Sequence, residues 1–174
     1  RSKHGAGTSP VVRDNVLVLV SDVRESEKSP SCILAFDAAS GQRIWKGERR
    51  CPTIDGGYAT PLLSSWNGRE VVVVRGWYDV CGYDLRTGDE LWSYAVPHEG
   101  RHLVASPVCD GNRLYIADAK RVSALDMSKL GTKESALVWS KPMAGEKSST
   151  PVVADGRLFL ITETGVAACL EAQT

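Results

Sequence analysis

The segment Ala35–Trp45 reads AFDAASGQRIW, and the segment Gly82–Trp92 reads GYDLRTGDELW. A looser copy begins with ALDMS at Ala124 and ends at Trp139. The three tryptophans follow one another at equal intervals of 47 residues. A fixed period of this length is typical of repeat proteins, in which each repeat folds as one small unit that packs on its neighbours.

A second phrase, Ser or Thr followed by Pro and an apolar segment, opens each unit. It occurs at Ser9-Pro10, Thr60-Pro61, Ser106-Pro107 and Thr150-Pro151. Each unit then divides into short segments rich in Val, Ile, Leu and aromatic residues, separated by turns such as Asp-Gly and Asn-Gly, which favour hairpins. The pattern predicts an all-β fold, a β-propeller whose blades are four-stranded antiparallel sheets.

The repeats are expected at approximately 8–52, 59–97, 105–143 and 149–174, the last one truncated, within a single partial propeller that spans 1–174. The recurrent residues are expected to be structural. Tryptophan fills the space between neighbouring sheets, glycine permits the turn between the third and fourth strands, and aspartate accepts hydrogen bonds from N–H groups of the turn. These residues are Asp37, Gly41, Trp45, Asp84, Gly88, Trp92, Asp126 and Trp139.

Composition excludes several classes of function. The 174 residues carry 21 basic and 21 acidic side chains, so a net charge of zero gives no reason to expect a nucleic-acid partner. No apolar run approaches the roughly 20 residues of a transmembrane helix, and the first ten residues lack the apolar core of a signal peptide.

The cysteines show no C-x-x-C pair, which argues against a zinc site. They are expected to be free and mostly buried, with a disulfide involving Cys51 as the alternative. The five are Cys32, Cys51, Cys81, Cys109 and Cys169.

The A-x-D-x-x-x-G-x-x-x-W phrase resembles the repeat of the pyrroloquinoline-quinone (PQQ) type propellers, and the resemblance covers nearly the whole chain. That family includes quinoprotein alcohol and sugar dehydrogenases. It also includes cofactor-free members, among them the propeller lipoprotein of the outer-membrane barrel-assembly machinery and many exported bacterial proteins. The resemblance implies that these repeats form part of a seven- or eight-bladed ring in a longer, exported protein, periplasmic or associated with the outer membrane.

The resemblance also gives a test for the cofactor. PQQ enzymes of the family hold the quinone between two adjacent cysteines and a tryptophan, beside a calcium ion bound by Glu and Asn. This sequence has no adjacent cysteines, and we interpret Trp66 and Trp77 as edge or blade-face aromatics rather than cofactor-stacking residues. No metal site is expected, and no catalytic residue is apparent, because nucleophile, zinc-protease and phosphate-loop motifs are absent.

The loops that precede each first strand are the candidate ligand-binding site. They should open onto one mouth of the central channel, and their side chains differ between repeats, whereas a fold-maintaining position would repeat. An ordinary solvated loop is the alternative interpretation. The candidate residues are His4, Asp55, Tyr58, Arg101, His102 and Lys147.

Three functions remain open from the sequence. The first is a non-catalytic binding or scaffold module with a protein or carbohydrate partner. The second is a fragment of a PQQ- and calcium-dependent dehydrogenase whose cofactor site lies in blades outside this chain. The third is a pseudo-enzyme or sensor that binds a small molecule in the channel.

Overall fold

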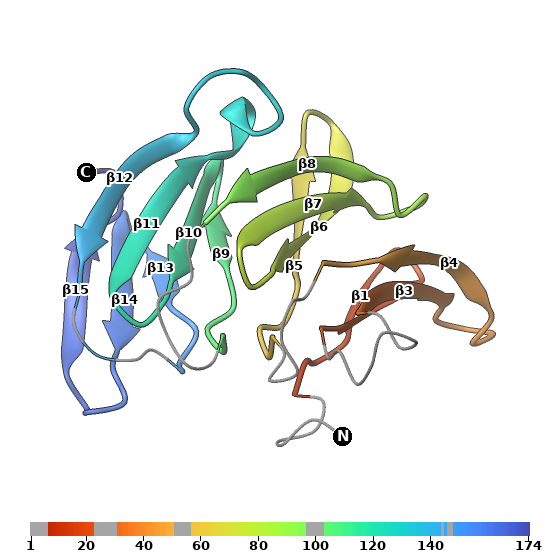
Figure 1. Ribbon diagram of the computed structural model, residues 1–174, viewed down its shortest axis with the longest axis horizontal. Helices are drawn as coiled ribbons and strands as arrows, with labels where there is room; N and C mark the ends of the chain where they lie inside the picture. The colour runs from red at the N-terminus through yellow and green to blue at the C-terminus, as the bar shows by residue number, and fades with distance from the viewer. Residues whose placement is uncertain (1–6, 23–30, 51–56, 97–102, 144, 146–147) are drawn as a thin grey trace.

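The computed structural model describes residues 7–22, 31–50, 57–96, 103–143, 145 and 148–174, and it contains four antiparallel sheets. Figure 1 shows the sheets arranged as an arc, with the first at one end and the fourth at the other. We call the sheets blades 1 to 4. The all-β propeller fold expected from the sequence is confirmed.

The strands follow the repeats in order. Blade 1 holds β1 (Val11–Arg13), β2 (Val16–Ser21), β3 (Cys32–Asp37) and β4 (Arg43–Glu48). Blade 2 holds β5 (Leu62–Trp66), β6 (Arg69–Arg75), β7 (Asp79–Asp84) and β8 (Glu90–Ala95). Blade 3 holds β9 (Val108–Asp110), β10 (Arg113–Ala117), β11 (Arg121–Asp126) and β12 (Leu137–Pro142). Blade 4 holds β13 (Val152–Ala154), β14 (Arg157–Ile161) and β15 (Ala167–Glu171).

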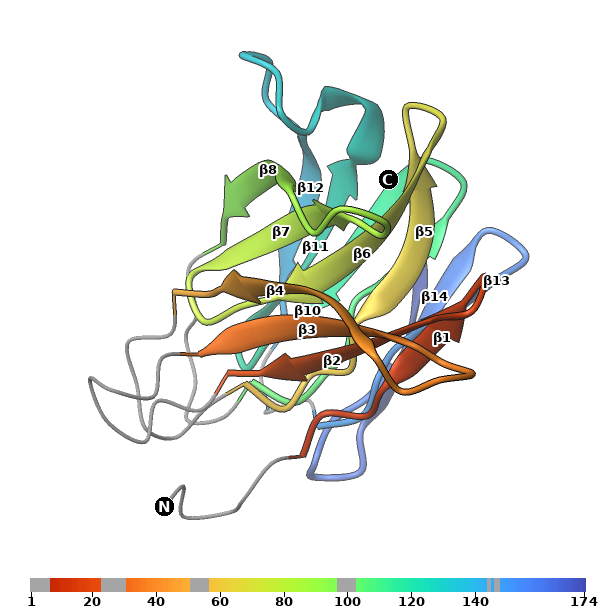
Figure 2. The same ribbon diagram turned by 90° about the vertical axis from the view of Figure 1, so that its right-hand side faces the viewer.

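Each blade is a meander in which consecutive strands pair, and this order is β1-β2-β3-β4 in blade 1. Figure 2, which views the arc from its blade 1 end, shows these four strands side by side. Blade 4 has three strands among the described residues. A β-bulge interrupts the pairing of the third and fourth strands after Ala35, Gly82 and Ala124, each of which pairs with the tryptophan of its own blade.

The turns show why Gly, Asn and Asp recur. Gly41 and Gly88 have φ angles of 72° and 78°, a region that disfavours a side chain. Asp37 Oδ1 accepts hydrogen bonds from the N–H groups of Ala39 (3.1 Å) and Ser40 (2.7 Å). Similar bonds reach Asp84 and Asp126. The pKa of the Asp37 carboxyl is lowered, chiefly by the bonds from Ser40, which favour its charged form.

The third repeat departs from the others between its third and fourth strands. Its longer connection forms a short 3₁₀ helix, η1 (Met127–Lys129), with Asp126 at its N-cap. This element was not expected from the sequence, because three residues are too few to show helical periodicity. No helix in the described ranges is long and apolar enough to cross a membrane.

The core consists of three apolar clusters, and each lies at a seam between two neighbouring blades. Val18 and Val74 belong to the cluster between blades 1 and 2, Val73 and Leu114 to the one between blades 2 and 3, and Tyr115 and Leu158 to the one between blades 3 and 4. The middle strands of blades 2 and 3 are therefore buried on both faces. This arrangement follows from stacking sheets face to face, since each face must be covered by a neighbour.

The Ser/Thr-Pro phrase has a structural role of its own. The backbone N–H of Ser9 donates to Thr60 Oγ1 (3.4 Å), that of Thr60 to Ser106 Oγ (2.8 Å), and that of Ser106 to Thr150 Oγ1 (3.3 Å). One hydroxyl in each of the second, third and fourth repeats thus joins its blade to the one before it. The proline that follows lies directly before the first strand of its blade, where its missing N–H removes no hydrogen bond between strands.

The thiols are less buried than the sequence suggested. The four described cysteines are free, and only Cys81 is buried. Cys32 and Cys109 are half-buried, and Cys169 is exposed because β15 belongs to the end blade of the arc, whose outer face also exposes Phe159 and Ile161. Cys51, the residue of the alternative disulfide, lies outside the described residues.

Candidate functional site

Each seam holds an indole that donates to the backbone of the next blade. Trp45 Nε1 donates to the carbonyl oxygen of Leu85 (3.1 Å), and Trp139 Nε1 donates to that of Ala172 (3.1 Å). Leu85 and Ala172 are equivalent, since each directly follows the last residue of the third strand in its blade. A repeated tryptophan in the fourth strand therefore fixes the distance between neighbouring sheets.

In the seam between blades 2 and 3, the tryptophan of the fourth strand does not make this hydrogen bond. Trp92 is 3% exposed, and its buried Nε1 has no hydrogen-bond partner in the part of the chain that the structure describes. The carbonyl oxygen of Met127, equivalent to those of Leu85 and Ala172, is instead bonded by Trp66 Nε1 (2.8 Å). Trp66 is thus a blade-face aromatic, whereas the sequence left open whether it lay at an edge or on a face of the blade.

Gly82 explains why Trp92 lies differently. A Cβ atom at Gly82 would be 2.2 Å from Cε2 of Trp92, so the indole rests directly on the glycine backbone. Blades 1 and 3 have Ala35 and Ala124 at this position, and their tryptophans are half-buried. The 2–3 seam therefore differs from the other two in both its tryptophan and the residue beneath it.

The loop ends gather at one end of the blades, which we call the mouth end. Gly57 forms an antiparallel bridge with Asp22 and a parallel bridge with Leu103, and the N–H of Tyr58 donates to the Leu103 carbonyl oxygen (2.7 Å). Segments from three successive repeats are therefore joined there. Tyr58 is the one candidate binding residue among the described residues. The others, His4, Asp55, Arg101, His102 and Lys147, lie outside them.

A buried ion pair within blade 1 lies at the same end, and its arginine also bonds to a tyrosine of blade 2. Arg49 Nε and Nη2 donate to the two carboxylate oxygens of Asp22 at 2.8 and 3.0 Å, and Nη1 donates to Tyr83 Oη at 2.7 Å. The side chains of Arg49 and Asp22 are 2% and 3% exposed. Burial is the largest single influence and alone would lower the pKa of Arg49. The charge of Asp22 and its hydrogen bonds, with smaller contributions from Tyr83 and Cys81, together outweigh burial, so the pKa is raised.

Arg75 is a second buried cation at the mouth end. In each blade, one residue of the second strand pairs with the acidic residue that ends the third strand. Four residues after it, blade 2 has Arg75, whereas the other blades have Val20, Ala117 and Ile161. Arg75 Nη1 donates to the carbonyl oxygens of Gly76 (2.6 Å) and Asp79 (2.8 Å).

The rest of the Arg75 guanidinium is unsatisfied. Its Nε and Nη2 have no hydrogen-bond partner within the described ranges. Burial lowers its pKa to about 10, although Asp118 and Asp79 act in the opposite direction, so it remains charged at neutral pH. Neither buried arginine was expected from the sequence. The feature of the sequence that could have revealed them is a charged residue at a position that is apolar in the other repeats.

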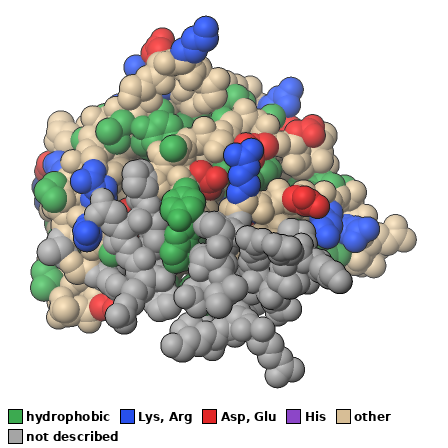
Figure 3. All heavy atoms as spheres, viewed as in Figure 1, with side chains coloured by type: hydrophobic (Ala, Val, Ile, Leu, Met, Phe, Trp, Pro, Cys, Tyr) green, Lys and Arg blue, Asp and Glu red, His purple; other side chains and the backbone are tan. Residues whose placement is uncertain are grey.

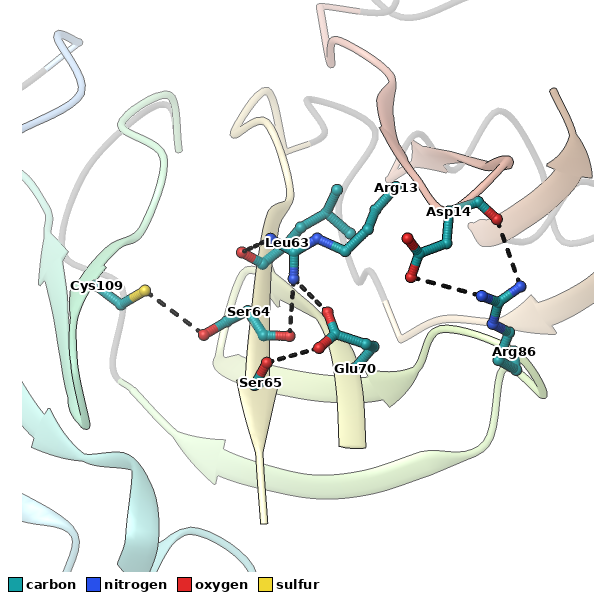
Figure 4. Close-up of polar contacts among 8 residues, drawn as sticks. All are labelled: Arg13, Asp14, Leu63, Ser64, Ser65, Glu70, Arg86 and Cys109. Carbon is teal, nitrogen blue, oxygen red and sulfur yellow. Dashed lines mark hydrogen bonds and ion pairs between the residues drawn. The ribbon is translucent and has the colours of Figure 1, made fainter. Parts of the chain in front are cut away.

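The opposite end, where the hairpin turns lie, carries a more exposed polar network (Figure 4). Arg13 of blade 1 pairs with Glu70 of blade 2 and donates to the carbonyl oxygen of Leu63 (3.4 Å). A hydrogen bond from Ser65 (2.7 Å), followed by the bond from Arg13, lowers the pKa of Glu70. These groups satisfy one another, so this end presents a cross-blade clamp rather than a set of open binding groups.

Comparison with known proteins identifies the family. A family model described as "Outer membrane protein assembly factor BamB" matches residues 1–174. The chain belongs to this family. No curated protein matches it.

Solved structures show the same fold. BamB from Moraxella catarrhalis is 22% identical with a TM-score of 0.68, and the match covers 95% of this chain and 50% of that one. This member of the BamB family thus spans about half the length of that relative. The computationally designed Ika4 protein is 16% identical with a TM-score of 0.59, covering 98% of this chain and 95% of that one. A europium-containing methanol dehydrogenase is 17% identical with a TM-score of 0.50, covering 80% and 25%. At such identities these likenesses show the fold alone.

The residues of this BamB-family chain do not fit a PQQ–calcium centre. Its cysteines are never adjacent in sequence, and no group of three or more His, Cys, Asp or Glu side chains among the described residues is placed to hold a metal ion. Burial raises the pKa of the Cys81 thiol to about 11, so this cysteine is a poor nucleophile at neutral pH. We therefore derive no reaction through the quinone.

Proposed function

We propose that this chain is a non-catalytic binding or scaffold module of an exported bacterial protein, periplasmic or associated with the outer membrane. Its partner is a protein that docks on the mouth end. The observation that supports this proposal most is the joining of Asp22, Gly57 and Leu103, which gives loops from three successive repeats a common base. Loops on a rigid sheet scaffold are where binding residues concentrate.

The buried charges strengthen this choice of end. Arg49, Asp22 and Arg75 occupy positions next to these loops, and two buried cations are costly unless they serve structure or recognition. The visible face in Figure 3 shows basic and acidic side chains interspersed, which suits a protein surface better than a nucleic acid. In this proposal Tyr58, with His4, Asp55, Arg101, His102 and Lys147, contacts the partner.

The test replaces two candidate residues together. The Arg101→Ala/His102→Ala variant is expected to bind solubilised outer-membrane barrel-assembly machinery, depleted of its own propeller subunit, at least about tenfold more weakly than the unaltered chain. Its melting temperature should stay within about 2 °C, because loop side chains contribute little to the core. Biolayer interferometry and differential scanning calorimetry measure the two quantities.

The matched control is Lys129→Ala/Lys133→Ala, which removes basic charge next to the hairpin-turn end of blade 3 and should leave binding unchanged. Full binding by the Arg101/His102 variant would exclude those loops from the site. No binding by the unaltered chain would contradict the proposal of this partner.

The dehydrogenase alternative makes the opposite prediction about cofactor. We expect PQQ with calcium to leave both the absorbance spectrum and the melting temperature of this chain unchanged, since a ligand stabilises a protein only if it binds the folded state. A rise of several degrees, together with a bound-quinone absorption band, would favour the dehydrogenase over the scaffold.

A further inference from the structure

The 2–3 seam contains a pocket that the scaffold function does not use. Its volume is about 210 Å³, below the roughly 300 Å³ of the smallest typical drug-sized pockets. One wall comes from β8 and the residue that follows it, and the other comes from the strands of blade 3. Its lining includes Val96, Ile116, Arg121, Ser123, Leu125 and Ser140.

Comparison with the 1–2 seam shows why the pocket exists. Arg49 and Val96 are equivalent residues, because each follows the fourth strand and donates its N–H to a carbonyl before the third strand (Ser31 and Tyr78). Tyr83 and Leu125 are likewise equivalent, each following the residue that pairs with tryptophan. The 1–2 seam is thus filled by an arginine on a tyrosine, 5.5 Å from guanidinium carbon to ring centre, where the 2–3 seam has two shorter side chains.

The polar groups of the pocket come from blade 3 and are concentrated on one side. Arg121 Nη1 donates to Ser140 Oγ (3.0 Å), and the hydroxyls of Ser123 and Ser140 share a hydrogen bond of 2.9 Å. No carboxylate of the described residues forms an ion pair with Arg121. The remaining wall is apolar, with Val96, Ile116 and Leu125 buried.

We propose that this pocket binds a small organic acid, with its carboxylate on Arg121 and the hydroxyls of Ser123 and Ser140, and a short apolar tail against Val96, Ile116 and Leu125. Guanidinium and hydroxyl donors together recognise a carboxylate strongly, and the apolar wall accommodates hydrocarbon. The 1–2 seam contains the same chemistry within the chain, since the carboxylate of Asp22 neutralises Arg49 there. At the 2–3 seam the ligand would supply the missing carboxylate.

The experiment measures binding to the full chain by isothermal titration calorimetry. The acid probes are butanoate, octanoate and 3-phenylpropanoate, and the matched neutral and cationic probes are 3-phenylpropanol and 3-phenylpropylamine. At least one acid is expected to bind with a dissociation constant of about 1 mM or tighter, as its size allows. The alcohol and the amine should bind at least about tenfold more weakly, because they cannot accept two charge-assisted hydrogen bonds.

Two variants locate the site. Ser123→Leu places in blade 3 the residue that blade 1 has at Leu34, the equivalent position before the alanine that pairs with tryptophan. It should abolish binding by filling the pocket. Arg121→Gln changes an exposed side chain whose one side-chain hydrogen bond among the described residues, to Ser140, is itself exposed. It should weaken acid binding at least about tenfold while leaving alcohol binding unchanged. Arg43→Gln, which removes the same charge from blade 1, is the control.

The outcomes separate clearly. Acid binding that both pocket variants weaken and Arg43→Gln does not weaken supports the site. Three results would each overturn it: no binding of any of the three acids at 10 mM or so, equal binding of acid and alcohol, or acid binding that survives Arg121→Gln. If Ser123→Leu fails to fold, as judged by circular dichroism, the Arg121→Gln comparison decides the question alone.

Discussion

The Asp22→Ala variant is expected to lose about 3–5 kcal/mol of unfolding free energy, because removing one partner of a buried ion pair leaves the other charge uncompensated. Arg49 would keep its bond to Tyr83 Oη but lose both bonds to the carboxylate. Urea unfolding followed by tryptophan fluorescence measures this loss.

Two further variants show whether the loss comes from the unpaired charge. The Asp22→Leu/Arg49→Met double variant should recover most of the lost stability, since apolar side chains can replace a buried pair at little cost. The Glu134→Ala variant, which breaks the exposed pair with Lys129, should cost less than about 1 kcal/mol. If Asp22→Ala costs no more than Glu134→Ala, the buried pair does not stabilise the mouth end of blade 1.

The second large effect is expected at the 2–3 seam. Trp92→Ala should cost about 3–5 kcal/mol, because it empties a site that is 3% exposed within an apolar cluster shared by two blades. No hydrogen bond is lost, since the indole N–H has no partner among the described residues. Tyr78→Ala, at a tyrosine that is 58% exposed in the same blade, is the control and should cost less than about 0.5 kcal/mol. Equal costs, measured by urea unfolding, would contradict the burial of Trp92.

Much of the architecture could be predicted from the sequence because the repeat encodes it several times over. The Asp-Gly and Asn-Gly turns, the apolar strands and the 47-residue spacing of Trp45, Trp92 and Trp139 each point to the same four-stranded blade. Agreement among local signals is what specifies a fold. The completion of a seven- or eight-bladed ring remains a prediction.

The departures from the repeat could not be predicted in the same way. The close contact of Trp92 with Gly82 depends on the register of the third and fourth strands of blade 2, which no local sequence pattern specifies. The ion pair of Arg49 and Asp22 joins residues 27 positions apart in sequence, beyond the reach of any local pattern. The pocket at Arg121 likewise appears only when Val96 is compared with Arg49 in three dimensions.

The candidate binding loops illustrate a different limit. Their residues were chosen because the side chains differ between repeats at positions that the fold does not fix. That choice depends on side-chain chemistry and not on geometry. Tyr58 lies at the joined loop ends, but five of the six candidates lie outside the described residues. Their role therefore depends on the binding experiment proposed above.

The exceptional 2–3 seam can be tested most directly by the indole N–H resonances of ¹⁵N-labelled chain, assigned by single Trp→Phe variants. The N–H groups of Trp45, Trp66 and Trp139 should exchange slowly with solvent and show downfield, hydrogen-bonded shifts. The N–H of Trp92 should exchange equally slowly but resonate upfield, because it is buried without an acceptor. A downfield, bonded Trp92 together with a rapidly exchanging Trp66 would contradict this arrangement of the seam.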